Sequence, residues 1–432
     1  MSFRGKISVL VISGFIAIYA VVGGMLSPWT RAQQPINDST AQMRIFESVL
    51  NHIQNDYVDE PNLEKVRYGA LRGLVGGLDP YSSYLTPEQV KAFNIKTPSN
   101  KVGIGAEFSQ LSLYLYVVSV SKGSPAEKAG VRSGDVVEYI ENKATRDISL
   151  YDAKQLIVGD AGTTVNLRIL RSAERPQSIK VTRGATKVPA VESKLEPGKI
   201  GVIKVFSLED GEANDIKTNL QSLMKQGADK IVLDLRGVAT GTLEEGVAAA
   251  NLFIKDGDIA KVVGKDGVVK KTFTADPSKA IFDGKLSVLI DLGTAGAAEA
   301  VASAVLDKKR GEVVGERSFG AGTEQQLFPL RGGDGLLLTV AKWASPSGVA
   351  FLGDDRATTG IKPSVEVKRP DTPAPIEVDE LIDQQQQQDQ NPQVTPSPTP
   401  APAKPKPVVQ DDIQLKKAIE ILQDKAQAAK AG

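Results

Sequence analysis

The chain has 432 residues, a hydrophobic fraction of 41%, and 52 acidic and 52 basic residues, so its formal net charge is zero. This length accommodates two or three domains with a sizeable core. The charge balance argues against a nucleic-acid-binding protein, which usually carries a basic excess. The absence of cysteine excludes disulfides, thiolate metal sites and a cysteine nucleophile. Because His52 is the single histidine, we expect neither a histidine-based triad nor a multi-histidine metal site. We also expect no bound metal and no cofactor.

The N-terminus has the pattern of an export signal. Arg4 and Lys6 precede an apolar run at residues 7–26, and a positive segment before such a run is typical of secretion. A run of about 20 residues also suffices to span a bilayer. We favour an uncleaved anchor over cleavage after Ala32, because Arg31 makes a poor cleavage site. Both interpretations predict an extracytoplasmic, periplasmic body, and the favoured one anchors it in the inner membrane.

The segment that follows is predicted to be helical. Apolar residues recur at three- and four-residue spacings from Met43 to Tyr57, which indicates an amphipathic helix. A second helix is expected to end at the glycines after Val75. The run Thr86-Pro87-Glu88 is expected to start a third helix, with proline at its first turn. His52 lies on the first of these helices, and we interpret it as a surface or packing residue.

Residues 97–185 have the alternating pattern of short strands. The loop that opens this segment consists of Gly103, Ile104, Gly105, Ala106, Glu107 and Phe108. Two glycines before a strand allow neighbouring backbone N–H groups to converge, which suits the terminal carboxylate of a peptide. The adjacent strand edge accepts such a peptide as an added strand. We therefore predict a peptide-binding site formed by residues 103–108.

This segment resembles a PDZ domain in its opening loop and in the run from Gly123 to Asp135. The resemblance implies recognition of apolar C-terminal peptide ends, with an amphipathic helix at residues 150–158 as the second wall of the groove. The alternative is a PDZ fold that packs within its own chain and binds no ligand.

From Lys199 onward, apolar strands alternate with helices. Strands are expected at residues 200–206, 230–235, 287–291, 312–315, 325–330 and 336–343, and helices at 212–225, 243–254 and 295–306. This order predicts a mainly parallel sheet covered on both faces. The glutamine run at 384–388 and the proline-rich stretch after it predict an extended linker. A final amphipathic helix at 411–429 is expected to dock on the body or on a partner subunit.

The whole arrangement resembles the C-terminal processing (tail-specific) serine peptidases over residues 40–367. The motifs that carry the likeness are LDPYSSYLTPEQ, KIVLDLR, LGTAGAAEAVASAVLD, VGERSFGAGT and AKWASPSG. The resemblance implies an α+β multidomain fold with a helical N-terminal region, a β-barrel-like PDZ domain and an α/β (crotonase/ClpP-like) peptidase core. The predicted boundaries are 1–32 for the signal or anchor, 38–96 for the helical region, 97–185 for the PDZ domain, 186–370 for the core, 371–410 for the linker and 411–432 for the C-terminal helix.

The catalytic residues of that family match this sequence only in part. The family uses a serine nucleophile and a lysine base supported by a glutamine; the matching positions here are Gly296, Ala321 and Gln325. The family's Asn-Pro-Gly-Gly turn, which helps to form the oxyanion pocket, is replaced by residues 237–241. Glycine and alanine have no atom that forms an acyl-enzyme or takes up a proton. The sequence therefore looks like a catalytically degenerate member.

Neighbouring polar residues offer no obvious replacement. Thr294 is interpreted as a helix cap, and Ser318 and Thr323 have no evident base beside them. Three lysines, Lys308, Lys309 and Lys342, would reach the site only in an unforeseen geometry.

Three hypotheses remain open at this point. The first is an extracytoplasmic pseudoprotease that binds protein C-termini as an adaptor or scaffold, alone, as a homo-oligomer or with an active homologous peptidase. The second is an active serine endopeptidase of unstructured C-terminal tails with an atypical site. The third is a structural envelope protein whose groove is filled by its own chain.

Overall fold

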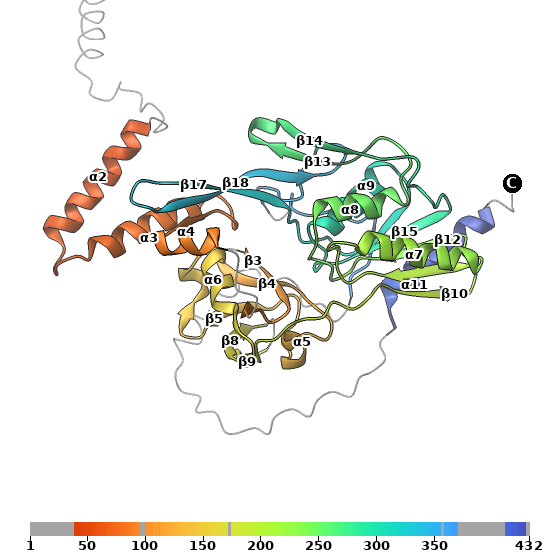
Figure 1. Cartoon of the computed structure of the whole chain (residues 1–432), viewed down its shortest axis with the longest axis horizontal. Coiled ribbons are helices and arrows are strands. Elements are labelled where there is room, and N and C mark those ends of the chain that lie inside the picture. Colours follow the sequence, from red (N-terminus) through yellow and green to blue (C-terminus); the bar gives the residue numbers. More distant parts are fainter. Residues whose placement is uncertain are drawn as a thin grey trace, which may run out of the picture. The chain divides into compact units, whose positions relative to one another are not determined.

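The computed structural model describes residues 39–95, 101–111, 113–171, 174–355, 358–369 and 411–428 (Figure 1). The chain divides into two compact units, Met1–Ala70 and Leu71–Gly432. The predicted anchor at residues 7–26 and the predicted linker at 371–410 lie outside the described residues. Within the described ranges, no helix combines the length and the apolar character needed to cross a membrane.

The first unit contains helix α2 (Ser39–Asp56) and the start of helix α3 (Leu63–Gly76). Both predicted helices are therefore confirmed. The side chain of His52 is 75% exposed and lies 2.5 Å from a carboxylate oxygen of Asp56, one turn along α2. This agrees with its interpretation as a surface residue.

The second unit opens with a tight turn and a capped helix. Asp79 accepts hydrogen bonds from the amides of Tyr81 and Ser82, which fixes the turn before strand β1 (Ser83–Leu85). Thr86 then caps helix α4 (Pro87–Asn94) in a capping box with Gln89. The predicted third helix, with proline at its first turn, is thus confirmed.

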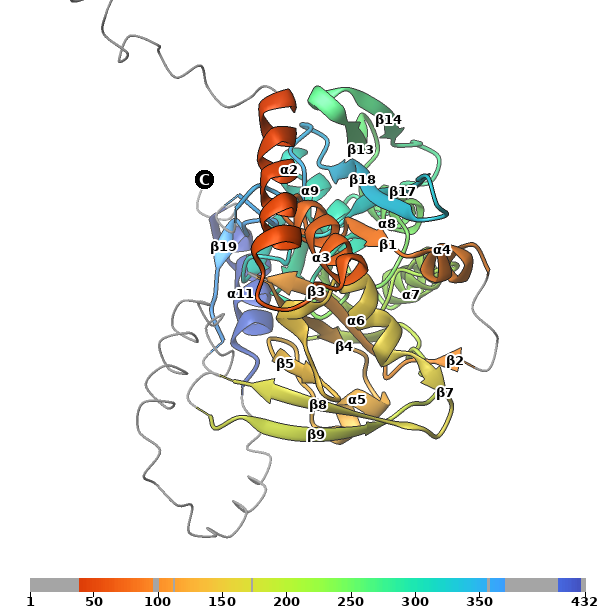
Figure 2. The same ribbon diagram turned by 90° about the vertical axis from the view of Figure 1, so that its left-hand side faces the viewer.

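The PDZ-like domain is built on a sheet with the strand order β3-β4-β5-β8-β9, with β6 paired to β5. Its elements are β2 (Lys101–Val102), β3 (Ala106–Leu111), β4 (Tyr114–Val120), α5 (Pro125–Ala129), β5 (Val136–Ile140), β6 (Lys143–Ala144), η2 (Thr145–Asp147), α6 (Leu150–Ile157), β7 (Gly159–Asp160), β8 (Thr164–Leu170) and β9 (Gln177–Thr182). Figure 2 shows β8 and β9 running together along one side of this domain. A buried ion pair joins Arg171, just after β8, to Asp135 at 2.5 Å and fixes the turn before β5.

The peptidase-like core is built on a six-stranded sheet with the order β10-β11-β12-β15-β16-β19. Only the β10–β11 pair is antiparallel, so the predicted mainly parallel sheet is confirmed. The strands are β10 (Glu192–Glu196), β11 (Ile200–Lys204), β12 (Lys230–Asp234), β15 (Lys285–Ile290), β16 (Glu312–Gly315) and β19 (Val365–Glu366). The helices α7 (Glu212–Lys225), α8 (Leu243–Asn251) and α9 (Ala297–Asp307) share one hydrophobic core with one face of this sheet.

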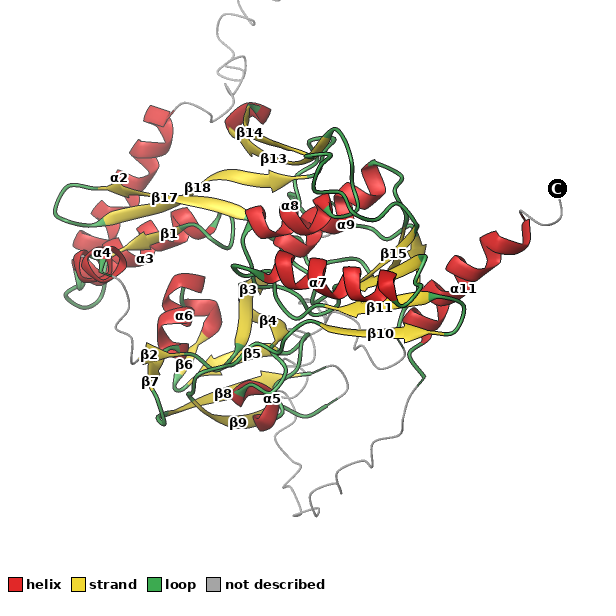
Figure 3. Cartoon of the chain, turned by 45° about the vertical axis from the view of Figure 1, so that its right-hand side comes forward, coloured by secondary structure: helices red, strands yellow, loops and turns green. Residues whose placement is uncertain are grey.

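The C-terminal helix α11 (Ile413–Ala428) covers the opposite face of the same sheet, beside its strands in Figure 3. On β12, Ile231 and Leu233 point into the core beneath α7–α9, whereas Val232 packs in a second cluster with Ala418 and Leu422 of α11. Alternate side chains of a strand point to opposite faces, which explains the continuous apolar run KIVLDL. The predicted amphipathic helix therefore docks on its own body.

Charged groups fix the start of α11 at the end of strand β12. Arg236 donates two hydrogen bonds to Asp412 at 2.7 and 2.9 Å and binds Asp234 at 2.7 Å. Burial of Asp234 opposes its ionisation, but Lys204 and Arg236 hold its pKa at about 2. This ionic contact lies directly before residues 237–241, the turn that the family resemblance assigns to the oxyanion pocket.

A second sheet has the strand order β1-β18-β13-β14, with β17 also paired to β18. Its remaining strands are β13 (Asp258–Gly264), β14 (Val269–Thr274), β17 (Thr323–Pro329) and β18 (Gly335–Ala344), and the short turn η3 (Lys265–Gly267) joins β13 to β14. The strands predicted at 325–330 and 336–343 are confirmed as β17 and β18, but the β13–β14 hairpin has no counterpart in the sequence-based prediction.

Candidate functional site

The strand-to-helix turn after β15 has the geometry of a nucleophile elbow. Gly296 caps α9 with φ 58° and ψ −112°, a conformation that L-residues rarely adopt. Such a sharp, strained turn is where α/β hydrolases expose a serine. A Cβ atom added at Gly296 would lie 3.5 Å from Trp343, an ordinary van der Waals contact. The turn thus has room for a side chain, although its backbone conformation would strain any residue other than glycine.

The interpretation of Thr294 as a helix cap is wrong. Helix α9 begins at Ala297 rather than at 295, and Gly296 occupies the cap position. Thr294 is fully buried, and its hydroxyl donates to the carbonyl of Leu235 at 2.9 Å. Its side chain therefore fastens the turn to the end of strand β12, a long-range contact that a local capping pattern does not reveal.

Glu299, on the first turn of α9, links Gly296 to Ala321. One of its carboxylate oxygens accepts the amides of Gly296 and Ala321, each at 2.8 Å. These two amides are therefore no farther apart than twice that distance. The other oxygen accepts the amide of Gly320 at 2.8 Å and the hydroxyl of Ser318 at 2.5 Å. One carboxylate thus holds the helix start and the 318–321 loop together.

The environment of Glu299 changes its acidity. Its side chain is fully buried, and burial raises its pKa to about 7, against the lowering effect of its four hydrogen bonds. The expectation that Ser318 has no base beside it is therefore wrong, because Glu299 is one. Ser318 is itself fully buried, however, and its hydroxyl also accepts the amide of Ile361 at 2.6 Å. This pair supports the loop and has no access to a substrate.

The structure brings Gly296 and Ala321 together on one carboxylate, whereas the side-chain amide of Gln325 donates its hydrogen bonds to other residues. Gln325 lies on β17 with an exposed side chain, whose amide donates to Thr323 at 2.6 Å and to Thr339 at 3.3 Å. Within the described part of the chain, no hydrogen bond joins it to Gly296 or Ala321. Thr323, on the same strand, accepts the shorter of the two Gln325 hydrogen bonds with its hydroxyl.

The turn at residues 237–241 uses its backbone groups for internal structure. The amide of Gly237 donates to Asp291 at 2.9 Å, and the carbonyl of Val238 accepts the amide of Ala295 at 2.9 Å. Gly241 has φ 142°, and a Cβ there would lie 2.3 Å from the carbonyl oxygen of Leu208. Only glycine fits that position, so the turn is a well-packed structure that differs from the family's motif.

The outer face of the PDZ-like sheet covers this site. Tyr116 on β4 stacks on Phe319, with ring centroids 5.8 Å apart. The full apolar cluster, with Leu111, Ala239 and Ala321 at its edge, contains Tyr114, Tyr116, Val118, Val136, Leu170, Leu292, Ala295 and Phe319. Ala321 therefore lies in apolar surroundings, between the core and the PDZ-like domain.

The predicted peptide-binding residues 103–108 line a cavity of about 320 Å³ together with α6, Glu209 and Thr240. Strand β3 is the edge strand of its sheet, which leaves it suited to accept an added strand. Gly105 has φ 75°, and a Cβ there would lie 2.4 Å from both Ser124 and Thr186. The loop conformation therefore requires glycine, and Thr240 of the 237–241 turn also lines the groove.

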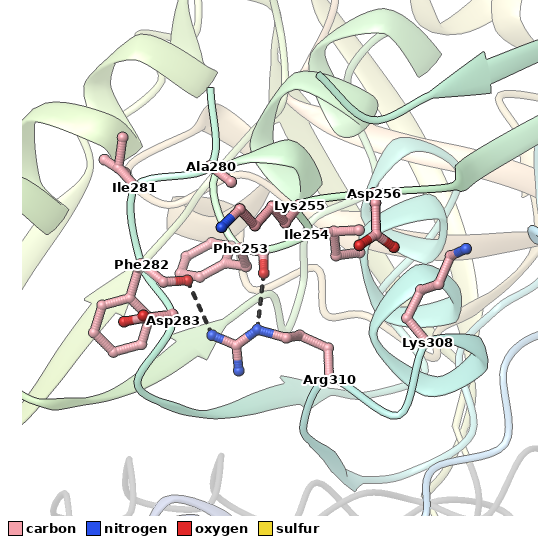
Figure 4. A pocket seen from close by; sticks show the side chains of 10 residues that line it. All are labelled: Phe253, Ile254, Lys255, Asp256, Ala280, Ile281, Phe282, Asp283, Lys308 and Arg310. Carbon is pink, nitrogen blue, oxygen red and sulfur yellow. Dashed lines mark hydrogen bonds between the residues drawn. The ribbon is translucent and has the colours of Figure 1, made fainter. Parts of the chain in front are cut away.

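Of the three lysines named from the sequence, Lys342 lies on β18 opposite Thr323, two residues from Ala321, and the other two line separate cavities. Lys342 pairs with Asp354 at 3.7 Å, and Lys309 lines a different cavity beside α11. Lys308 lines a third cavity of about 380 Å³, in which Arg310 donates to the carbonyls of Phe253 and Phe282 (Figure 4). The latter two cavities include none of the residues of the candidate site.

The fold and the site define a serine-peptidase architecture with an inserted PDZ domain. The profile of the PDZ domain matches residues 116–171, and that of Peptidase family S41 matches residues 199–367. Two relatives named "Probable CtpA-like serine protease" are 33% identical over 368 residues in Staphylococcus haemolyticus and 34% over 371 residues in Staphylococcus aureus. Each alignment covers 84% of this chain and 72% of the relative. The chain belongs to Peptidase family S41, the C-terminal processing serine peptidases.

A solved structure supports the same fold. The photosystem II D1 C-terminal processing protease matches with a TM-score of 0.63 and 27% sequence identity, covering 75% of this chain and 86% of that chain. The predicted combination of helical N-terminus, PDZ domain and α/β core is thereby confirmed.

The role of Glu299 is the part of the site that sequence reasoning missed. The position of Glu299 in the small-residue run AAEAVASAV indicates part of this role. Glu299 is the third residue of the helix, where a glutamate closes a capping box. Its bonds to the 318–321 loop, about 20 residues downstream, follow only from the tertiary structure.

Proposed function

We propose that this protein is a pseudoprotease that binds protein C-termini through its PDZ domain and does not hydrolyse them. The observation that carries the proposal is the convergence of Gly296 and Ala321 on the carboxylate of Glu299. The elbow and its loop are in contact, but neither position supplies an atom that attacks a carbonyl or removes a proton. Residues 237–241 also differ from the family's Asn-Pro-Gly-Gly turn, and this difference supports the same proposal.

A second candidate, an active peptidase with an atypical site, has one observation in its favour. Ser318 and Glu299 form a hydroxyl–carboxylate pair at 2.5 Å, which resembles a nucleophile and its base. Against this candidate, both side chains are buried, and the Ser318 hydroxyl is already used within the loop. We therefore prefer the binding function, and the groove of about 320 Å³ favours an external ligand over a purely structural role.

The proposed setting is extracytoplasmic. We infer from Arg4, Lys6 and the apolar run at 7–26 that the N-terminus holds the protein at the inner membrane with its body in the periplasm. There the protein would act as an adaptor or scaffold, as a homo-oligomer or beside an active homologous peptidase. A relative with intact catalytic residues would then cut the C-termini that this protein presents.

Peptide binding is the first expected result. A peptide with apolar last residues and a free carboxylate should bind at least about tenfold more tightly than its C-terminal amide, because the loop amides bind a charged acceptor. Fluorescence anisotropy with the full-length chain measures the affinities of both peptides. Gly105→Ala should abolish this difference, because the added methyl collides with Ser124 and Thr186.

Gly123→Ala is the matched control for Gly105→Ala. Gly123 also has a positive φ, 78°, but a Cβ there meets no atom within 4 Å. This variant carries the same backbone strain without the collision and should retain the preference for the free carboxylate. Equal affinity of the acid and the amide for the unmodified protein would overturn the binding proposal.

A further inference from the structure

The peptide groove is lined by two carboxylates and by only one cation among the described residues. Glu107 on β3 and Glu209 in the loop after β11 both line the cavity of about 320 Å³. Among the described residues that line it, Lys154 on α6 is the one cation, and it lies 3.9 Å from Glu107. Glu209 is exposed and forms no ion pair with any residue in the described ranges. The groove therefore has one more negative charge than positive.

The two carboxylates influence each other. The pKa of Glu107 is raised, chiefly by burial and further by Glu209, while Lys154 opposes the shift. The negative field extends beyond the groove, since Glu209 also contributes to the raised pKa of Glu212 at the start of α7. A half-buried carboxylate that remains partly uncompensated favours a cation from outside.

The geometry of an added strand places that cation within the ligand. Glu107 is the second residue after Gly105 of the carboxylate-binding loop. Strand residues rise about 3.3 Å each, so Glu107 lies roughly 7 Å along the groove. An antiparallel peptide whose terminal carboxylate sits in the loop passes Glu107 at the second or third residue before its terminus.

We propose that Glu107 and Glu209 make this groove selective for C-terminal peptides that carry a lysine or arginine two or three residues before an apolar terminus. This inference rests on the proposed peptide-binding function and adds the substrate class to it. The apolar end is recognised by Ile104, Ile157 and Val158, and the basic side chain completes the charge balance of the groove.

Three peptides test the inference with the full-length chain. They share an apolar C-terminal residue and a free carboxylate, and they differ only in having lysine, glutamine or glutamate at the third position from the end. We expect the lysine peptide to bind about fivefold more tightly than the glutamine peptide, and the glutamate peptide to bind more weakly still. The ratio should shrink at high salt, because the glutamates are partly exposed.

Variants without the charge of Glu107 or Glu209 test whether these two residues cause the preference for lysine. Glu107→Gln and Glu209→Gln should each reduce the lysine preference at least about twofold. Glu366→Gln removes the same charge from an exposed position on β19 and should leave the preference unchanged. Equal affinity for all three peptides, or a preference that survives in both groove variants, would overturn the selectivity while leaving peptide binding intact. If none of the peptides binds, the proposed function itself fails.

Discussion

The variant Gly296→Ser with Ala321→Lys should react covalently with a serine-directed fluorophosphonate at least about 100-fold faster than Gly296→Ser alone. A general base contributes about 10²–10⁴ in rate, and the single variant lacks the lysine at position 321. The amides of both positions bind one oxygen of Glu299, so the new side chains start from adjacent backbone. Intact-mass spectrometry of the modified protein over time measures the reaction.

The surroundings of Ala321 favour this result. A lysine there would lie among the apolar residues of the Tyr116–Phe319 cluster, and burial lowers the pKa of an amine. The new lysine would therefore be partly neutral near pH 7, as a base must be. Ala321→Lys alone is the matched control and should show no labelling at residue 296. Labelling of the double variant no faster than that of Gly296→Ser would show that the 237–241 turn, and not only the missing groups, prevents chemistry.

Glu299→Ala should lower the free energy of unfolding by about 4 kcal/mol. The substitution leaves four donors at Gly296, Ser318, Gly320 and Ala321 without their acceptor, and each unsatisfied buried group costs about 1–3 kcal/mol. Part of this loss is recovered because a desolvated carboxyl is removed as well. Urea unfolding monitored by circular dichroism measures the change, and a loss below about 1 kcal/mol would contradict the role assigned to Glu299.

The pH dependence of the free energy of unfolding provides a second test of the role of Glu299. The folded-state pKa of Glu299 is raised from its ordinary 4.5 to about 7. The folded protein therefore binds this proton more tightly than the unfolded chain. Protonated Glu299 stabilises the fold fully below pH 4.5, and this stabilisation is lost as the pH rises through about 7. Its size is about 3 kcal/mol. The stability of the unmodified protein relative to Glu299→Gln, which does not titrate, should fall by that amount over this interval.

The large elements were predictable from local patterns. Continuous apolar strands such as KIVLDL, followed by helices ended by glycine, indicated the parallel sheet, and the loop at residues 103–108 indicated the PDZ groove. The proposal that Gly296 and Ala321 stand at the nucleophile and base positions came from the motifs LGTAGAAEAVASAVLD and VGERSFGAGT. These features are encoded within short windows of sequence, where periodicity and turn chemistry decide the structure.

The elements that escaped prediction depend on distant partners. Strand β14 has the sequence VKKTFT and is mostly exposed, so its pairing with β13 leaves little hydrophobic signal. The apolar face of α11 was visible, but its docking surface on Val232 and its ionic anchor at Arg236 come from residues about 180 positions earlier. Thr294 and Glu299 matched local capping patterns, and long-range hydrogen bonds gave them different or additional roles.

The measurement that tests the central claim most directly is the fate of a bound substrate. An unfolded protein with an apolar C-terminus is incubated with the purified full-length chain, and intact-mass spectrometry follows it while anisotropy reports binding. We expect a complex in which the substrate keeps its full mass throughout. Cleavage products that increase with the concentration of the chain, and that disappear in Ser318→Ala, would show that the protein is an active peptidase with an atypical site.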